Sequence, residues 1–252
     1  MARFARVQTS AGFRYAFDEG AHWRVLQAAP WEGVQPTDET VPKTNAQLGV
    51  PVLASKVVAV GQNYRQHAAE MGKPVPVEPL IFIKPSSALN AHLSPIVIPP
   101  ASEEVHHEAE LALIIGKKLK NASEVEAEAG IFGLSCFNDV TARDVQRREV
   151  QHTRAKGYDT FACLGPVVVA GVSPSDLRIV ARVNGAVRQD GRTSDMIFSP
   201  ARLVSFISSV MTLFPGDVVS TGTPSGVGPI RSGDWVEIDI EHVGVLKNPV
   251  LR

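Results

Sequence analysis

The sequence predicts an α+β fold in which strands predominate, and three observations lead to this prediction. Short apolar runs recur along most of the chain and are bounded by glycine, proline and asparagine, as strands and their turns commonly are. Few segments have the 3.6-residue apolar spacing of a helix. The predicted strands do not alternate with helices in the order that regular βαβ units require, which favours an α+β or mostly-β fold.

The first fifty residues differ from the rest and predict a small N-terminal β region over residues 1–50. The alternating runs Arg3–Val7 and Phe13–Phe17 predict a hairpin that turns around Ser10–Gly12. The stretch that follows contains several acids and predicts loop because of three prolines: Pro30, Pro36 and Pro42. The main domain is expected to cover residues 51–252.

Beyond this region, apolar runs predict strands and a hairpin. The strands, in chain order, are residues 56–60, 80–83, 96–98, 108–115, 133–138, 166–170, 218–219 and 235–240. A hairpin is predicted over residues 179–188, because Asn184-Gly185 supplies the turn that right-twisted strands favour.

Three segments predict helices. Residues 64–71 predict one or two helical turns, which Gly72 and Pro74 end. Ser123-Glu-Val-Glu126 is a capping box and opens a short helix. Residues 200–213 carry apolar side chains at helical spacing.

Composition and charge exclude several classes of protein. The chain has 252 residues, of which 44% are hydrophobic and 20% charged, as is ordinary for a soluble globular protein. Its formal net charge of −1 creates no overall field that would recruit nucleic acid or anionic lipid. Apolar runs such as Leu111–Ile115 are far shorter than the roughly 18 residues of a membrane span. Because the basic start lacks a signal-peptide core, the cytoplasm is the expected location.

The two cysteines, Cys136 and Cys163, lie in apolar surroundings and predict buried free thiols. Two isolated cysteines form neither a disulfide framework nor a zinc ligand set. A thiol nucleophile is the alternative.

The strongest chemical feature is the run His106-His-Glu-Ala-Glu110, which leads into an apolar strand. Residues two apart share a face of a strand, so Glu108 and Glu110 are expected to project together. Two adjacent carboxylates beside an apolar run repel each other unless a cation lies between them or one is protonated. A solvent-exposed pair at a strand end is the alternative.

Asp139 favours the metal interpretation, because it ends a second apolar strand in a stretch suited to burial. Three carboxylates without a cysteine or paired-histidine set predict a hard cation, Mg²⁺ or Mn²⁺, held by Glu108, Glu110 and Asp139. His106 and His107 lack the spacing of zinc ligands, so we expect them to contact the metal ligands without binding the ion, or to lie at the surface.

A second chemical feature is the pair His67 and Glu70, which are neighbours at i, i+3 on a helix. A carboxylate can fix the tautomer of an imidazole and raise its basicity, which makes the two a proton-transfer pair. A surface ion pair on a short helix is the alternative.

Two further segments are weaker signals. Arg154–Thr160, which includes Lys156, is a polar loop before an apolar strand, and an ordinary solvated loop is the alternative. Ser220–Gly228 is rich in glycine, and its backbone amides can hold an anion. It lacks the lysine and the spacing of a nucleotide P-loop, which disfavours a nucleotide-dependent enzyme. A plain structural turn is the alternative there.

Taken together and in this order, the motifs resemble those of the fumarylacetoacetate hydrolase family, in its bacterial acylpyruvase and 2-hydroxyhepta-2,4-diene-1,7-dioate isomerase-like branch. The resemblance covers roughly residue 56 to the C-terminus. The segments that carry it are Val60–Tyr64 with His67 and Glu70, Phe82–Pro85, His107–Glu110, Phe137–Asp144, Lys156–Asp159 and Thr221–Gly228.

The resemblance implies a mixed β-roll, a homodimer, and Mg²⁺ or Mn²⁺ bound by carboxylates that match the three acids above. By the same match, His67 and Glu70 lie on a lid segment that orders over the substrate, and Lys156 is an active-site lysine. The positions expected to hold the substrate are Arg143, Gln146, Tyr158 and Thr223.

The expected substrate is a small 2-oxo acid, which binds the cation through its carboxylate and keto oxygens and reacts through an enolate. The leading interpretation is hydrolysis of a carbon–carbon bond in acylpyruvate-type diketo acids, with His67 activating water and Lys156 stabilising the developing charge. Oxaloacetate tautomerase, decarboxylase and diene-dioate isomerase are the enzymatic alternatives, because each uses the same enolate. A non-catalytic metal- or ligand-binding protein is the alternative of another class, and the His67–Glu70 pair disfavours it.

Overall fold

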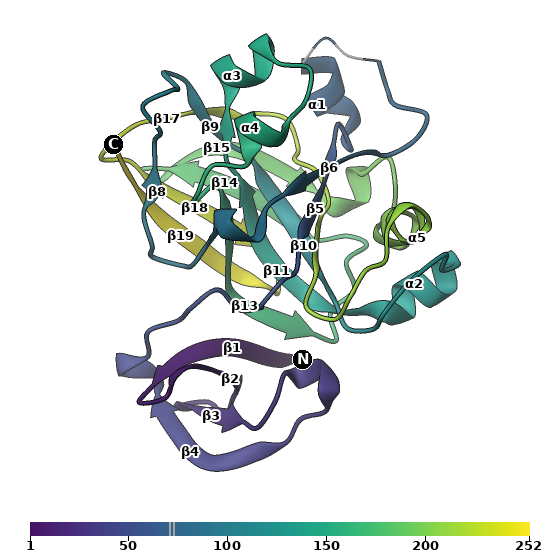
Figure 1. Ribbon diagram of the computed structural model, residues 1–252. Helices are drawn as coiled ribbons and strands as arrows, with labels where there is room; N and C mark the ends of the chain where they lie inside the picture. The colour runs from purple at the N-terminus through teal and green to yellow at the C-terminus, as the bar shows by residue number, and fades with distance from the viewer. Residues whose placement is uncertain (71, 73) are drawn as a thin grey trace.

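The computed structural model describes residues 1–70, 72 and 74–252. Strands predominate and form three sheets, with short helices on the outside (Figure 1). The predicted α+β, mostly-β fold with mixed sheets is therefore confirmed.

The largest sheet runs through the molecule and carries the carboxylates of interest. Its strand order is β4-β3-β2-β1-β13-β11-β10-β16-β5-β6, and β7 pairs with β13 beside this path. The strands are β1 (Ala2–Thr9), β2 (Gly12–Asp18), β3 (His22–Leu26), β4 (Pro36–Pro42), β5 (Val57–Gly61), β6 (Leu80–Lys84), β7 (Leu89–Asn90), β10 (Ala109–Ile115), β11 (Ile131–Asp139), β13 (Ala162–Ala170) and β16 (Val218–Ser220).

Strand directions bring several functional segments to one edge of this sheet. β10 and β11 are antiparallel, with Ala109 opposite Asn138, so the start of β10 lies beside the end of β11. β10 is also antiparallel to β16, and β16 is parallel to β5. The segments that follow β5, β11 and β16 therefore meet the start of β10 at the same edge.

A five-stranded sheet packs against the first, and the hydrophobic core lies between them. Its order is β15-β14-β18-β19-β8, with β8 (Ile96–Val97), β14 (Arg178–Val183), β15 (Ala186–Arg192), β18 (Trp235–Ile240) and β19 (Gly244–Leu251). A small third sheet joins β12 (Thr141–Ala142), β9 (Val105–His107) and β17 (Gly228–Ile230). Leu111 of the first sheet and Ile238 of the second belong to one buried cluster. β14 and β15 confirm the predicted hairpin, in which Asn184 has a φ of 53°.

The helices of the described chain are short. They are α1 (Arg65–Glu70), α2 (Glu124–Gly130), α3 (Arg143–Arg148), α4 (Thr153–Lys156) and α5 (Pro200–Val210). The capping box of α2 is confirmed, because the Ser123 hydroxyl accepts from the Glu126 amide and the Glu126 carboxylate accepts from the Ser123 amide. α1 confirms the helical turns predicted over residues 64–71, of which Met71 lies outside the described residues.

One loop prediction was wrong, and a second holds only for residues 157–160. The stretch after residue 30 contains β4, which begins at Pro36, ends at Pro42 and pairs antiparallel with β3. The strand tolerates these prolines because it is the edge of the sheet, where the outward side of the strand needs no backbone donors. The loop expected over Arg154–Thr160 begins inside α4, a single helical turn that buries Ala155 and Lys156.

The strands of the N-terminal region lie at one end of the molecule (Figure 1) but continue the main sheet, because β1 pairs with β13. The division of the chain into residues 1–50 and 51–252 stays a prediction. Within the described residues, no helix has both the length and the apolar character needed to cross a membrane.

Candidate active site

A cavity of about 560 Å³ opens at the sheet edge where these segments meet. Most of the residues predicted for the site line it: His67, Glu108, Glu110, Asp139, Arg143, Gln146, Lys156 and Thr223. The structure therefore brings together side chains that are up to 156 positions apart in the sequence.

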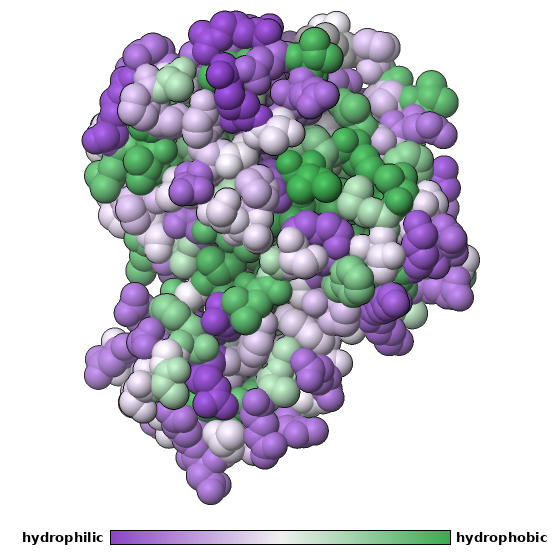
Figure 2. Space-filling view, in the orientation of Figure 1, coloured by the Kyte–Doolittle hydropathy of each residue, from purple (hydrophilic) through white to green (hydrophobic). Residues whose placement is uncertain are grey.

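The solvent-facing part of the cavity is mixed in character. Leu80 and Val150 line it and are 42% and 98% exposed. Figure 2 shows apolar surface over β6 and the chain that leads into it. The charged residues Arg147 and Glu149 line the same cavity.

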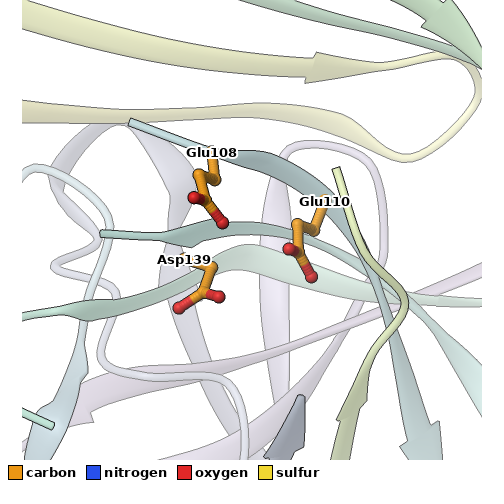
Figure 3. Close-up of side chains that lie close together, drawn as sticks. All are labelled: Glu108, Glu110 and Asp139. Atoms are coloured by element: carbon orange, nitrogen blue, oxygen red, sulfur yellow. The ribbon is translucent and has the colours of Figure 1, made fainter. Parts of the chain in front are cut away.

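Three buried carboxylates converge in this cavity. Glu108 lies in the link between β9 and β10, Glu110 on β10 and Asp139 at the end of β11. One oxygen from each residue lies within 4.8 Å of the other two. The side chains approach one another from neighbouring strands (Figure 3). Their exposed fractions are only 4%, 1% and 1%.

The backbone holds the carboxylates in this arrangement. The Glu108 amide donates to Asn138 Oδ1 at 3.0 Å, and the Asp139 amide donates to the Glu108 carbonyl at 2.9 Å. The second bond extends the β10–β11 ladder past the start of β10, and the first ties Glu108 to a side chain of β11, so the acids are positioned by paired strands. Glu108 and Glu110 point to the same side, as their spacing of two predicts.

Three cationic side chains are buried against the cluster. The Lys156 ammonium lies 2.9 Å from Glu108 and 2.5 Å from Asp139. The Arg143 guanidinium lies 2.5 Å from the other oxygen of Glu108. The Lys84 ammonium pairs with the other oxygen of Asp139 and donates to the Val140 carbonyl. Such pairing is required, because an unpaired buried charge strongly destabilises a fold.

The two glutamates have opposite protonation tendencies. Burial raises the pKa of Glu108, but the Lys156 ammonium and the Arg143 guanidinium together outweigh it and hold this pKa well below its ordinary value. Burial raises the pKa of Glu110 to about 8, and the neighbouring charges of Asp139 and Glu108 add to the increase. Glu110 is therefore the member of the cluster whose charge is least compensated.

The residues present fit a hard divalent cation. In the described part of the chain, no cationic side chain pairs with Glu110, whose carboxylate accepts from the Ser220 hydroxyl and, at 2.9 Å, from the Gly222 amide. A cation among the three carboxylates would supply the missing positive charge. The ligand atoms are all carboxylate oxygens, the donors that Mg²⁺ and Mn²⁺ prefer.

His67 and Glu70 form the pair expected on α1. His67 Nδ1 lies 3.1 Å from a Glu70 oxygen, and His67 is buried and lines the cavity. The Glu70 carboxylate also accepts from the Gly226 amide at 3.1 and 3.2 Å. The acid is therefore held between the helix and the glycine-rich loop, where it can orient the imidazole.

The predicted substrate-binding residues are only partly assembled. Arg143 donates to the Gln146 side chain at 2.5 Å, and both line the cavity with Thr223. Tyr158 is not among the lining residues, and its ring packs edge-on against Phe161 with 5.3 Å between centroids. Its contact with substrate stays a prediction.

The glycine-rich segment after β16 binds the protein's own carboxylates. The Gly222 amide donates to Glu110 and the Gly226 amide donates to Glu70. Gly222 has a φ of +95°, a conformation that favours glycine. The anion expected at these amides is therefore supplied from within the chain.

His106, His107 and the two cysteines lie outside the carboxylate cluster. His106 receives a long hydrogen bond of 3.4 Å from Arg143, and its Nε2 lies 3.0 Å from Glu104. His107 is fully buried, and burial lowers its pKa to about 4. Cys136 and Cys163 are buried free thiols, as predicted, and burial raises the pKa of each to about 12.

Comparison with known proteins identifies the family of this chain. Residues 56–251, well over half of the chain, match the family model described as fumarylacetoacetate (FAA) hydrolase C-terminal. The chain belongs to the fumarylacetoacetate hydrolase family. Residues 2–51 match a second model, described as Rv2993c-like, N-terminal. The family membership predicted from the motifs is confirmed.

Similar members of the fumarylacetoacetate hydrolase family bear the names of different enzymes. Human mitochondrial oxaloacetate tautomerase FAHD2A is 42% identical over 224 residues, which cover 84% of this chain and 71% of that protein. A crystal structure of 2-hydroxyhepta-2,4-diene-1,7-dioate isomerase from Mycobacterium marinum is 43% identical, with a TM-score of 0.93 over 100% of this chain and 99% of that chain. Fumarylacetoacetate hydrolase from Exiguobacterium antarcticum is 31% identical, with a TM-score of 0.89 and the same coverage.

Some residues of this family member's site were missed by the sequence analysis. Lys84 was noted only as part of a motif, although a lysine that ends an apolar strand directly before a proline is a usable signal of a buried charge. Ser220, which donates to Glu110, ends the short strand β16. Gln189 is the partner of His107 at 3.0 Å and had no recognisable pattern around it.

Proposed function

We propose that this chain is a Mg²⁺- or Mn²⁺-dependent enzyme that moves a proton on small 2-oxo acids, as in the keto–enol tautomerisation of oxaloacetate or the isomerisation of a diene-dioate. The observation that carries the proposal is the presence of two functional groups in one cavity. The carboxylates Glu108, Glu110 and Asp139 line it together with His67, which pairs with Glu70. A protein that only bound a ligand would not need the second group.

Each part of the site has a role in such a reaction. When bound, the ion supplies the positive charge that draws the substrate's carboxylate and keto oxygens and stabilises an enolate. His67, oriented by Glu70, moves the proton between C3 and the enol oxygen of oxaloacetate, or between the enol oxygen and the far carbon of the diene in a diene-dioate. Arg143 and Lys156 line the cavity as fixed positive charges that stabilise negative charge on the substrate.

The charges of the site favour an anionic substrate. The three carboxylates and the three cationic side chains Lys84, Arg143 and Lys156 balance in total charge, although the cations pair only with Asp139 and Glu108. A divalent ion would therefore leave an excess of two positive charges in a buried site. A small dicarboxylate such as oxaloacetate would neutralise that excess, whereas a neutral ketone would not.

Hydrolysis of a carbon–carbon bond in an acylpyruvate is the second candidate. The sequence alone placed it first, but the named tautomerase and isomerase relatives are 42% and 43% identical to this chain, and the named hydrolase is 31% identical. Hydrolysis is supported by the room in the cavity of about 560 Å³ and by the same His67, which would then take its proton from water. Decarboxylation needs no such base, so the His67–Glu70 pair favours it least.

A substrate panel tests these candidates. Enol-oxaloacetate, acylpyruvates and diene-dioates would be assayed with Mg²⁺, with Mn²⁺ and with EDTA. Solvent deuterium would be followed into the carbon that gains the proton, which is C3 in oxaloacetate and the far carbon of the diene in a diene-dioate. We expect metal-dependent deuterium exchange with the dicarboxylates. Release of pyruvate and a carboxylic acid from an acylpyruvate, without exchange, would favour hydrolysis. Turnover that EDTA does not affect would contradict the metal assignment.

Three expectations remain predictions beside this proposal: the homodimer, the cytoplasmic location, and the closure of α1 over the substrate as part of a lid.

A further inference from the structure

The amide of Gln189 is buried in an otherwise exposed strand. Of the seven residues of β15, only Gln189 is fully buried, with 1% of its surface exposed. β15 is the edge strand of the five-stranded sheet. Its one inward side chain nevertheless reaches the first residue of β10, next to Glu108, and the glycine-rich segment that carries Thr223.

All four hydrogen-bonding positions of this amide are used. Gln189 Oε1 accepts from the Ala109 amide at 2.9 Å and lies 3.0 Å from His107 Nδ1. Gln189 Nε2 donates to the Pro224 carbonyl at 2.8 Å and to Thr223 Oγ1 at 2.7 Å. Ala109 lies between the two glutamates of the cluster, and Thr223 lines the cavity.

These partners allow one orientation of the Gln189 side-chain amide and one of the Thr223 hydroxyl. The Ala109 amide can only donate and the Pro224 carbonyl can only accept, so the oxygen and nitrogen of the Gln189 amide cannot be exchanged. The second N–H of the amide must therefore donate to Thr223 Oγ1. Across residues 1–70, 72 and 74–252, no hydrogen bond uses the Thr223 hydroxyl as a donor. Its proton is left for a group in the cavity.

We propose that Gln189 is a positioning residue that makes the Thr223 hydroxyl a fixed hydrogen-bond donor toward the substrate. The group that it receives is an acceptor, a carboxylate or keto oxygen of the 2-oxo acid. The inference rests on the proposed function, because it takes this cavity as the substrate site. A free threonine hydroxyl rotates and can donate or accept, and the amide removes that freedom before the substrate binds.

Two glycines let β15 approach the segment that holds Thr223. A Cβ on Gly191 would lie 2.8 Å from the Pro224 Cβ atom, and a Cβ on Gly226 would lie 2.2 Å from the Arg188 carbonyl oxygen. Strand and segment are therefore in close contact on both sides of the amide. This close packing makes the link between Gln189 and Thr223 stiff.

Gln189→Glu tests the proposal, because it keeps the shape and the accepting oxygen but replaces the donor to Thr223 by a second acceptor. The Thr223 hydroxyl would then donate to the new carboxylate and turn away from the cavity. We expect oxalate to bind the Mg²⁺-loaded variant about 10- to 100-fold more weakly by calorimetry. KM for the 2-oxo acid should rise by a similar factor, with a smaller change in kcat.

A double-mutant cycle with Thr223→Val separates the effect of the lost hydroxyl contact on oxalate binding from the effect of the added negative charge. Thr223→Val alone should weaken oxalate binding as much as Gln189→Glu does, and the double variant should bind no more weakly than either. Thr223→Ser, which keeps the hydroxyl, should bind oxalate more tightly than Thr223→Val does. Asp190→Asn, which alters the neighbouring exposed residue of the same strand, should retain wild-type binding. Gln189→Met removes the donor without adding charge and frees the Thr223 hydroxyl rather than turning it away, so it should weaken oxalate binding less than Gln189→Glu does.

Two results would overturn the inference while the proposed function stands. One is wild-type oxalate affinity in Gln189→Glu and Gln189→Met, with wild-type melting temperatures. The other is that Gln189→Glu lowers oxalate affinity by the same factor in the Thr223→Val background as in the wild type. The new charge would then act without the Thr223 hydroxyl. A wild-type protein that binds no oxalate and turns over no 2-oxo acid with either ion would instead overturn the proposed function.

Discussion

At the scale of single residues, Glu110 differs from its neighbours because no cation pairs with it in the described part of the chain. Glu110→Gln keeps the shape of the side chain and removes its charge. We expect Mn²⁺ affinity to fall at least about 100-fold, since changes to groups that merely support a metal ligand already cost 10- to 100-fold. Titration calorimetry would measure this, with the exposed Asp176→Asn as the control. Unchanged Mn²⁺ affinity would remove Glu110 from the ligand set.

His67 has a different expected signature, because it lines the cavity without belonging to the carboxylate cluster. His67→Ala should lower kcat about 10²- to 10⁴-fold, the usual range for a lost general base, and should leave Mn²⁺ affinity unchanged. His242→Ala, which alters a surface histidine, is the matched control. A wild-type kcat in His67→Ala would exclude this side chain from the reaction.

At the scale of elements, the glycine-rich segment after β16 connects the carboxylate cluster with the His67–Glu70 pair, because its amides donate to Glu110 and to Glu70. Gly222 has a φ of +95°, and a Cβ there would lie 2.7 Å from the Cβ of Asn63. Gly222→Ala should therefore lower the free energy of unfolding by about 1–3 kcal/mol and shift the amide that donates to Glu110, which weakens Mn²⁺ binding. Urea denaturation and calorimetry would measure the two effects.

Gly20→Ala is the control for this element, because Gly20 has a φ of +80° but open space around the added Cβ. It carries the backbone strain without the steric clash, so it should destabilise the fold less and leave Mn²⁺ affinity unchanged. Equal effects of the two substitutions would show that close packing around Gly222 does not position the Glu110 ligand.

At the scale of the whole molecule, stability should depend on pH and on metal together. Glu110 has its pKa raised from an ordinary 4.5 to about 8, so between these values the folded, metal-free protein binds more protons at this group than the unfolded chain does. The stabilisation that Glu110 provides is fully present below about pH 4.5 and is lost as the pH rises through about 8. Glu110→Gln should remove this part of the pH dependence, as measured by denaturation in EDTA from pH 5 to 9.

A bound divalent ion should take the place of that proton. We therefore expect Mn²⁺ to raise the melting temperature more at pH 8 than at pH 6. At a free concentration of one hundred times Kd, the ion should stabilise the fold by about 2.7 kcal/mol. EDTA should reverse the effect. An equal rise at both values of pH would show that no proton leaves the site when the ion binds.

Local patterns in the sequence predicted a large part of this protein. The spacing of two between Glu108 and Glu110, the capping box at Ser123 and the Asn184-Gly185 turn depend on neighbours within a few residues, and the structure has each of them. The edge strand β4 was missed because a proline is tolerated only where a strand lacks an outer neighbour. That condition depends on the sheet rather than on the residues of the strand.

By itself the sequence determined the family, the predominance of strands and the identity of the three acids, because side-chain period and motif order are properties of short segments. Only the tertiary structure decided which charges and amides surround those acids. Lys84 meets Asp139 from 55 positions away and Gln189 meets Thr223 from 34 positions away, across different strands. Such partners are brought together by sheet register and burial, and the hydrogen bonds available to these buried groups then select their orientation.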